Sequence, residues 1–149
     1  HNTIFFLLSH TPNRSAIKIE VSIREIEDIN SYDLIDFYGT GVLVMKKEDI
    51  FANKLIALKH RHAPSPRDLY DINYFFRQKW NISEEIIEEV LNQTLDNYLE
   101  SLIPFIENSF NKETIHQGIG ELLEGQSQRD FVKRSLITDT IKRIQIYLD

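Results

Sequence analysis

The chain has 149 residues, of which 42% are hydrophobic and 27% are charged, and it contains no cysteine. This length and composition are typical of a globular protein that buries a core. The missing thiols exclude disulfide bonds and cysteine zinc sites, and a reducing, cytoplasmic setting is the plain expectation. The formal net charge of −6 argues against a protein that coats nucleic acid nonspecifically, because such binding needs many lysine and arginine contacts to phosphate.

The first part of the chain predicts a β-hairpin. Residues 3–9 are rich in isoleucine, phenylalanine and leucine, and residues 16–23 alternate between apolar and polar side chains. The apolar run over 4–8 is far too short to span a membrane, so no membrane association is expected. A third short strand is predicted over 40–45, after an acidic connection over 25–38.

From Lys47 onward the apolar residues recur at helical spacing. Two prolines break the first helix over 63–66, because the residue before a proline is pushed away from the helical region. Later helices are predicted over 67–79, 83–93, 95–108 with an interruption near Pro104, 112–124 and 128–148. The order of elements predicts an α+β fold with two parts: a small antiparallel sheet over 1–46 and a helical bundle over 47–149.

A polar stripe on the second predicted strand is the first candidate for chemistry. Lys18, Glu20, Ser22 and Arg24 share one face, because side chains alternate along a strand. The carboxylate of Glu20 could bind Mg²⁺ or orient a hydroxyl nucleophile, since hard cations prefer oxygen ligands. The alternative is a solvated strand face with cross-strand ion pairs.

The second candidate is a set of charged residues on two helices joined by a tight turn. Lys54 and Arg61 are seven residues apart, and Asp68 and Asp71 are three apart, so each pair lies on one helical stripe. With Arg67 they could form a phosphate clamp, because phosphoryl transfer relies on cations that stabilise negative oxygens. The alternative is an interhelical salt-bridge network.

Two further patterns are interpreted as structural. The aromatic residues between positions 70 and 80 indicate core packing rather than a platform for stacking bases. The basic residues of the helix predicted over 128–148, Arg143 among them, could approach RNA, but a solvated helix face explains them as well.

Several spaced motifs together resemble the AbiEii family of nucleotidyltransferase-like toxins. They are Ile17–Val21, Glu48–Ile50, Lys54–Ala57 and Arg67–Ile72, in this order. The resemblance implies a minimal nucleotidyltransferase fold with a helical C-terminal part, in bacterial toxin–antitoxin and phage-defence systems. It also implies a nucleoside triphosphate and Mg²⁺ as cofactors, tRNA, another RNA or a protein as acceptor, and an antitoxin as partner.

The same resemblance suggests roles for individual residues. Glu20 matches the strand carboxylate near the metal, and Lys54 matches the helix lysine that contacts the triphosphate. Asp68 matches the aspartate of an Arg-Asp motif, with Arg67 as its partner and Asp71 as the second acid. Glu20, Lys54 and Asp68 are therefore the candidate catalytic residues, and the candidates for nucleotide binding are Lys54, Arg61, Arg67 and Asp71.

One family motif is missing from the chain. A Gly-Ser followed by an Asp-x-Asp pair, which binds the two metal ions, occurs nowhere in the sequence. In the family it lies upstream of the strand pair with which this chain begins. We therefore expect a C-terminal portion that is inactive alone, because a two-metal site without two of its carboxylates cannot hold the ions.

Two other expectations remain open at this point. The bare edge of the apolar hairpin predicts pairing with another chain, and thus a homodimer. The alternative to an enzyme is a non-enzymatic interaction module, for example one bound by an antitoxin. A relative that keeps the fold and has lost catalysis is a third interpretation.

Overall fold

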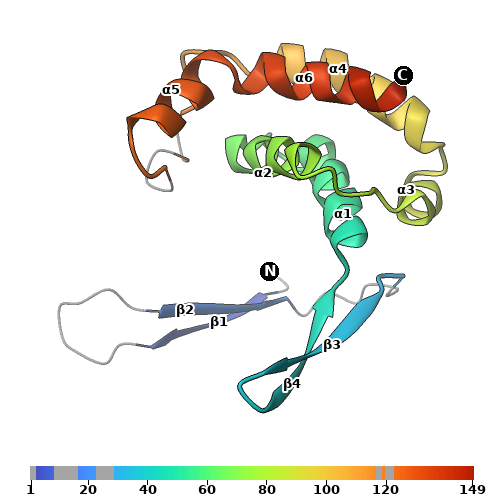
Figure 1. The fold of residues 1–149 in the computed structure, drawn as a ribbon, viewed down its shortest axis with the longest axis vertical. Helices are drawn as coiled ribbons and strands as arrows, with labels where there is room; N and C mark the ends of the chain where they lie inside the picture. Colours follow the sequence, from blue (N-terminus) through green and yellow to red (C-terminus); the bar gives the residue numbers. More distant parts are fainter. Residues whose placement is uncertain (1–2, 9–16, 23–28, 117–118, 120–122) are drawn as a thin grey trace.

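The computed structural model describes residues 3–8, 17–22, 29–116, 119 and 123–149. Two β-hairpins precede a body of helices, which confirms the predicted α+β class (Figure 1). Figure 1 shows both hairpins on one side of the molecule and the helices on the other. No helix within the described ranges is long and apolar enough to cross a membrane.

The first hairpin joins β1 (Thr3–Leu8) to β2 (Ile17–Ser22) in antiparallel register, as predicted. Phe6 lies opposite Ile19, so one face of this hairpin carries only apolar side chains. On the other face Glu20 lies opposite Phe5. The polar positions of β2 thus share one face, as the alternation predicts.

The second hairpin joins β3 (Tyr32–Phe37) to β4 (Thr40–Met45). Tyr38 and Gly39 connect them with φ values of 51° and 82°, the left-handed pair that a two-residue hairpin turn needs, and glycine adopts it without strain. An acidic connection was predicted over 25–38, and this prediction is wrong for the residues that form β3. Residues 25–28 of that segment lie outside the described residues. The strands form two separate two-stranded sheets instead of one.

Large apolar side chains are exposed on both faces of the β3–β4 hairpin. Leu34 and Leu43 lie opposite each other on one face, and Ile35 and Val42 on the other, and all four are exposed. Strands that are apolar on both faces are typical of sheets whose two faces are covered. The helical body leaves this hairpin uncovered (Figure 1).

The helical body contains six described helices. They are α1 (Lys47–His60), α2 (Pro66–Arg77), α3 (Glu84–Leu91), α4 (Leu95–Ser109), α5 (Gln126–Arg134) and α6 (Leu136–Leu148). Helix α2 packs against α1 and against α6, and α4 also packs against α6. The main core lies between these helices and is built from aliphatic and aromatic side chains.

Two contacts in this core fix the position of α1. The ring of Phe51 packs edge-on against Phe75 and Phe76 of α2, with centroids 5.4 and 4.8 Å apart. The hydroxyl of Tyr98 in α4 donates a hydrogen bond to the carbonyl oxygen of Leu55 at 2.9 Å, and burial raises the pKa of this tyrosine. Helix α1 is therefore held by contacts with both α2 and α4.

Three predicted helices differ from the structure. Helix α4 runs through Pro104 without interruption, because Pro104 is exposed and water can bond the carbonyl that a proline leaves without a donor. The helix predicted over 128–148 is two helices, which break at Ser135. The start of the helix predicted over 112–124 forms turns, and residues 117–118 and 120–122 lie outside the described residues.

Candidate functional site

The turn between α1 and α2 brings the candidate charged residues together. Ser65 is extended and precedes Pro66 at the first position of α2, where a proline is preorganised for a helix. The amide of Leu69 donates to the carbonyl oxygen of Ser65 at 3.2 Å, which closes the first turn. This first turn of α2 also contains Asp68. The side chain of Asp68 therefore faces α1, directly after the chain reverses direction between the two helices.

Lys54 is the centre of the charge cluster. Its Nζ lies 2.8 Å from Asp68 Oδ1 and 2.9 Å from Asp71 Oδ2, and Arg61 Nη1 lies 3.1 Å from Asp68 Oδ2. The side chain of Asp68 is 2% exposed, whereas Lys54 is 30%, Asp71 41% and Arg61 54% exposed. The cluster thus has one buried carboxylate, Asp68, and a partly exposed rim that contains Lys54, Asp71 and Arg61.

The protonation state of Lys54 follows from these contacts. Burial by itself lowers the pKa of an amine, but the hydrogen bonds and charges of Asp68 and Asp71 outweigh it and raise the pKa of Lys54 above its ordinary value. Lys54 is therefore a cation throughout the neutral range. It can stabilise negative charge, and it is unsuited to accept a proton as a base.

One oxygen of the cluster lacks a hydrogen-bond donor. Asp68 Oδ2 is buried and has the charge of Arg61 nearby, but no hydrogen bond from the described residues reaches it. Buried carboxylate oxygens normally accept hydrogen bonds, so Asp68 Oδ2 depends on the nearby charge of Arg61 for its stabilisation.

The structure does not bring Glu20 to the Lys54 cluster. Its side chain is 57% exposed on β2 and forms an ion pair with Lys18. Figure 1 shows this hairpin apart from α1 and α2. The predicted cross-strand ion pair is thus replaced by one along the strand.

The described residues do not form a Mg²⁺ site by themselves. No group of three or more acidic, histidine or cysteine side chains in the described ranges could hold a metal ion. Glu20 offers a single carboxylate, and its ion pair with Lys18 opposes a second cation there. No step of a reaction is therefore assigned to a metal on this chain.

A buried aspartate at the start of α1 ties the helix to the second hairpin. The amide of Ser31 donates to Asp49 Oδ2 at 2.5 Å, and the Asn53 side chain donates to Asn30 Oδ1 at 2.6 Å. The sequence motif Glu48–Ile50 contains Asp49, but the motif did not indicate that this side chain is buried. No local signal marks Asp49, because the amide that bonds it belongs to Ser31, 18 residues earlier in the chain.

A second polar cluster joins α2 to α6. Asn73 donates to Asp139 Oδ2 at 2.9 Å and to Thr140 Oγ1 at 3.1 Å, and Arg143 Nε donates to Asp139 Oδ2 at 2.8 Å. Burial alone would raise the pKa of Asp139, but the hydrogen bonds from Arg143 and Asn73 outweigh it and lower that pKa. Sequence analysis missed this cluster, since its members are far apart in the chain.

A family of nucleotide-transferring proteins matches this chain by its sequence. The sequence model of the family described as "Nucleotidyl transferase AbiEii toxin, Type IV TA system" matches residues 3–141. The chain therefore belongs to the AbiEii family of nucleotidyl transferase toxins. This confirms the resemblance and extends it beyond the quoted motifs to nearly the whole chain. The comparisons with curated proteins and with solved structures found no match.

Proposed function

We propose that this chain is the C-terminal, triphosphate-contacting portion of a nucleotidyl transferase toxin, which moves a nucleotide from a nucleoside triphosphate to an RNA or protein acceptor. Membership of the family supports the reaction class. The observation that supports the site is the Lys54 ammonium group, held 2.8 and 2.9 Å from two carboxylates at the partly exposed junction of α1 and α2.

Lys54 is the proposed contact to the triphosphate. Asp71 is the more exposed of its two partners and therefore the weaker one, so a phosphate oxygen can replace it. The buried Asp68 keeps the amine in place during this exchange. Arg61 and Arg67 are both exposed near this junction and are proposed to bind the remaining phosphate oxygens.

Asp68 and Glu20 have different proposed roles. Asp68 is proposed to position the amine of Lys54, because it is buried and lies 2.8 Å from that amine. Glu20 is proposed to become a Mg²⁺ ligand only in a larger protein that supplies further carboxylates, replaces its ion pair with Lys18 and brings the β1–β2 hairpin to the Lys54 cluster. Its exposed position on β2 supports access to a ligand.

The chain by itself is proposed to be inactive. The Gly-Ser and Asp-x-Asp motif is absent from its sequence, and the described residues form no metal-binding group of their own. Activity is therefore proposed only for a gene product that carries this motif before β1.

A non-enzymatic interaction module is the second candidate, and the exposed hairpins favour it. Apolar residues such as Phe5, Leu34 and Leu43 are more than half exposed. Contiguous apolar surface of this kind marks an interface in most soluble proteins. An antitoxin or a second copy of the chain is the proposed partner for this surface.

Transfer of a labelled nucleotide tests the proposed function. The product of the whole gene is incubated with Mg²⁺, total RNA, protein and each of the four nucleoside triphosphates, labelled at the α-phosphate. We expect label in one acceptor class, and no label with this chain alone. A whole gene product that labels neither RNA nor protein with any of the four nucleotides would favour the interaction module.

A further inference from the structure

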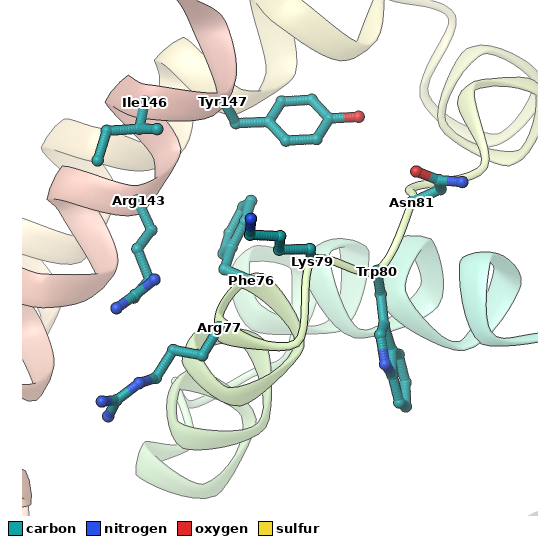
Figure 2. A pocket seen from close by; sticks show the side chains of 8 residues that line it. All are labelled: Phe76, Arg77, Lys79, Trp80, Asn81, Arg143, Ile146 and Tyr147. Carbon is teal, nitrogen blue, oxygen red and sulfur yellow. The ribbon is translucent and has the colours of Figure 1, made fainter.

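A pocket of about 370 Å³ lies between the end of α2 and the end of α6 (Figure 2). Phe76 and Arg77 contribute from α2, Trp80 from the segment after it, and Arg143 and Tyr147 from α6. Its volume is within the range of small-molecule sites, about 300–1,000 Å³. The pocket is distinct from the Lys54 cluster, because Asp68 and Arg77 are nine residues apart on α2, or about 14 Å along a helix.

The pocket is cationic although the chain as a whole is acidic. Its described lining includes Arg77, Lys79 and Arg143 and no carboxylate. Figure 2 shows Arg77 and Arg143 extending toward the same side of the pocket. Such a pair of guanidinium groups suits a phosphate, which accepts several hydrogen bonds at once.

Arg143 is held in place and still has donors to offer. Its Nε and Nη2 face Asp139, at 2.8 and 3.4 Å, and Asn73 fixes that carboxylate from α2. A guanidinium group has five N–H donors, so this pairing leaves about three for a ligand. Asp139 therefore orients Arg143, and with Arg77 nearby the local charge remains positive.

Arg77 is oriented by an aromatic ring. Its guanidinium group lies 5.1 Å from the centroid of the Phe131 ring, a cation–π contact that leaves the in-plane donors accessible. Lys79 follows in a left-handed conformation with φ of 55°, and this residue carries the third positive charge.

The other part of the pocket is aromatic. The rings of Phe76 and Tyr147 meet edge-to-face with centroids 5.9 Å apart, and Trp80 also lines the pocket, with its ring directed away from Tyr147 (Figure 2). The pKa of Tyr147 is raised by burial and by the charges of Glu84 and Asp96, so acidic groups lie near this aromatic end. An anion would therefore bind at the arginine side and a flat ring at the aromatic side.

We propose that this pocket binds a nucleotide, with its phosphate at Arg77 and Arg143 and its base against the exposed ring of Tyr147. The nucleotide is either free in solution or one residue of a single-stranded RNA, since both carry the same phosphate and base. Rings and arginines beside each other are the usual means of binding single strands. The inference goes beyond the transfer site, and its test does not require activity.

Trp80 provides a direct signal for binding, because it is the one tryptophan in the sequence and it lines the pocket. Its fluorescence is followed during titration of the 149-residue chain with adenosine monophosphate, with a six-residue polyadenylate and with inorganic phosphate, at one ionic strength. We expect a saturable change with at least one of the two nucleotide probes, and a weaker one or none with phosphate.

The variant Arg77→Gln with Lys79→Asn tests the assignment of the charges. Asparagine tolerates the left-handed backbone at position 79, and Arg143 is kept because its loss would also disturb Asp139. We expect binding to weaken about tenfold or more. The matched control Lys133→Gln with Lys142→Gln removes the same charge outside the pocket and should bind as the unchanged chain does.

The relative affinities of the probes distinguish a free nucleotide from an RNA strand as the ligand. Monophosphate binding as tight as that of the oligomer indicates a free nucleotide, and clearly tighter binding of the oligomer indicates an RNA strand. The inference is overturned if neither nucleotide probe gives a saturable change, if phosphate alone binds as tightly as both, or if the pocket variant and the control bind alike. The titration measures binding without any transfer of a nucleotide, so its result does not depend on activity at the transfer site.

Discussion

Replacing Asp68 by alanine is expected to lower the free energy of unfolding by about 3 kcal/mol, because removing one partner of a buried ion pair leaves the other charge uncompensated. Asp68 is 2% exposed and is in contact with both Lys54 and Arg61. The value lies at the lower end of the usual range for buried pairs, because both cations are partly exposed and water can reach them.

Urea denaturation of the 149-residue chain measures this change. The matched control is Asp71→Ala, which removes a carboxylate at nearly the same distance from Lys54 but at 41% exposure. We expect the control to lose less than about 1 kcal/mol, as exposed ion pairs do. Equal losses for the two variants would show that burial of Asp68 is not what anchors the cluster.

Replacing Lys54 by glutamine is expected to lower the rate of nucleotide transfer by the whole gene product about 100-fold, the usual effect of removing one group that stabilises transition-state charge. Lys54 is the member of the cluster with contacts to both carboxylates, and its raised pKa keeps it charged. Glutamine keeps most of the length of the side chain and removes only the charge.

The control for this variant is Lys59→Gln on the same helix. Lys59 Nζ donates to Ser101 Oγ at 2.9 Å and has no contact with the Asp68 cluster in the described structure. It should transfer at nearly the unchanged rate. Because Lys54→Gln also weakens a buried pair, both variants are compared at a temperature where circular dichroism shows them folded. A folded Lys54→Gln protein with unchanged transfer would exclude the proposed role.

Local patterns in the sequence were enough to predict most of the helical part. The apolar spacing over α1, the two prolines before α2 and the polar Ser83 before α3 each act within a few residues. The pairing of Lys54 with Asp68 was also within reach, because a short turn between two helices restricts which stripes can face each other.

Features that depend on distant contacts were not predictable in this way. The strand β3 was missed because Asp33 and Asp36 interrupt its apolar pattern, and its pairing with β4 is what stabilises it. The division into α5 and α6 was missed because Ser135 is not a strong helix breaker. Such elements are determined by tertiary context more than by propensity.

The pocket between the ends of α2 and α6 was also not predictable from local sequence patterns. Arg143 was grouped with other basic residues on one helix face, but the break between α5 and α6 separates them, and Asp139 directs Arg143 into the pocket. Trp80 was interpreted as core, and its ring does stack on Phe75 with centroids 4.3 Å apart. Trp80 also lines a cationic pocket. This pocket forms only because α6, more than 50 residues away in the sequence, packs nearby.

Protection of lysines from acetylation is the most direct test of the claim that Lys54 contacts the triphosphate. The whole gene product is treated with a trace of acetylating reagent, with and without saturating ATP and Mg²⁺, and the rate at each lysine is read by mass spectrometry. We predict that the nucleotide slows acetylation of Lys54 several-fold and leaves Lys142 unchanged. Equal rates at Lys54 with and without bound nucleotide would contradict the claim.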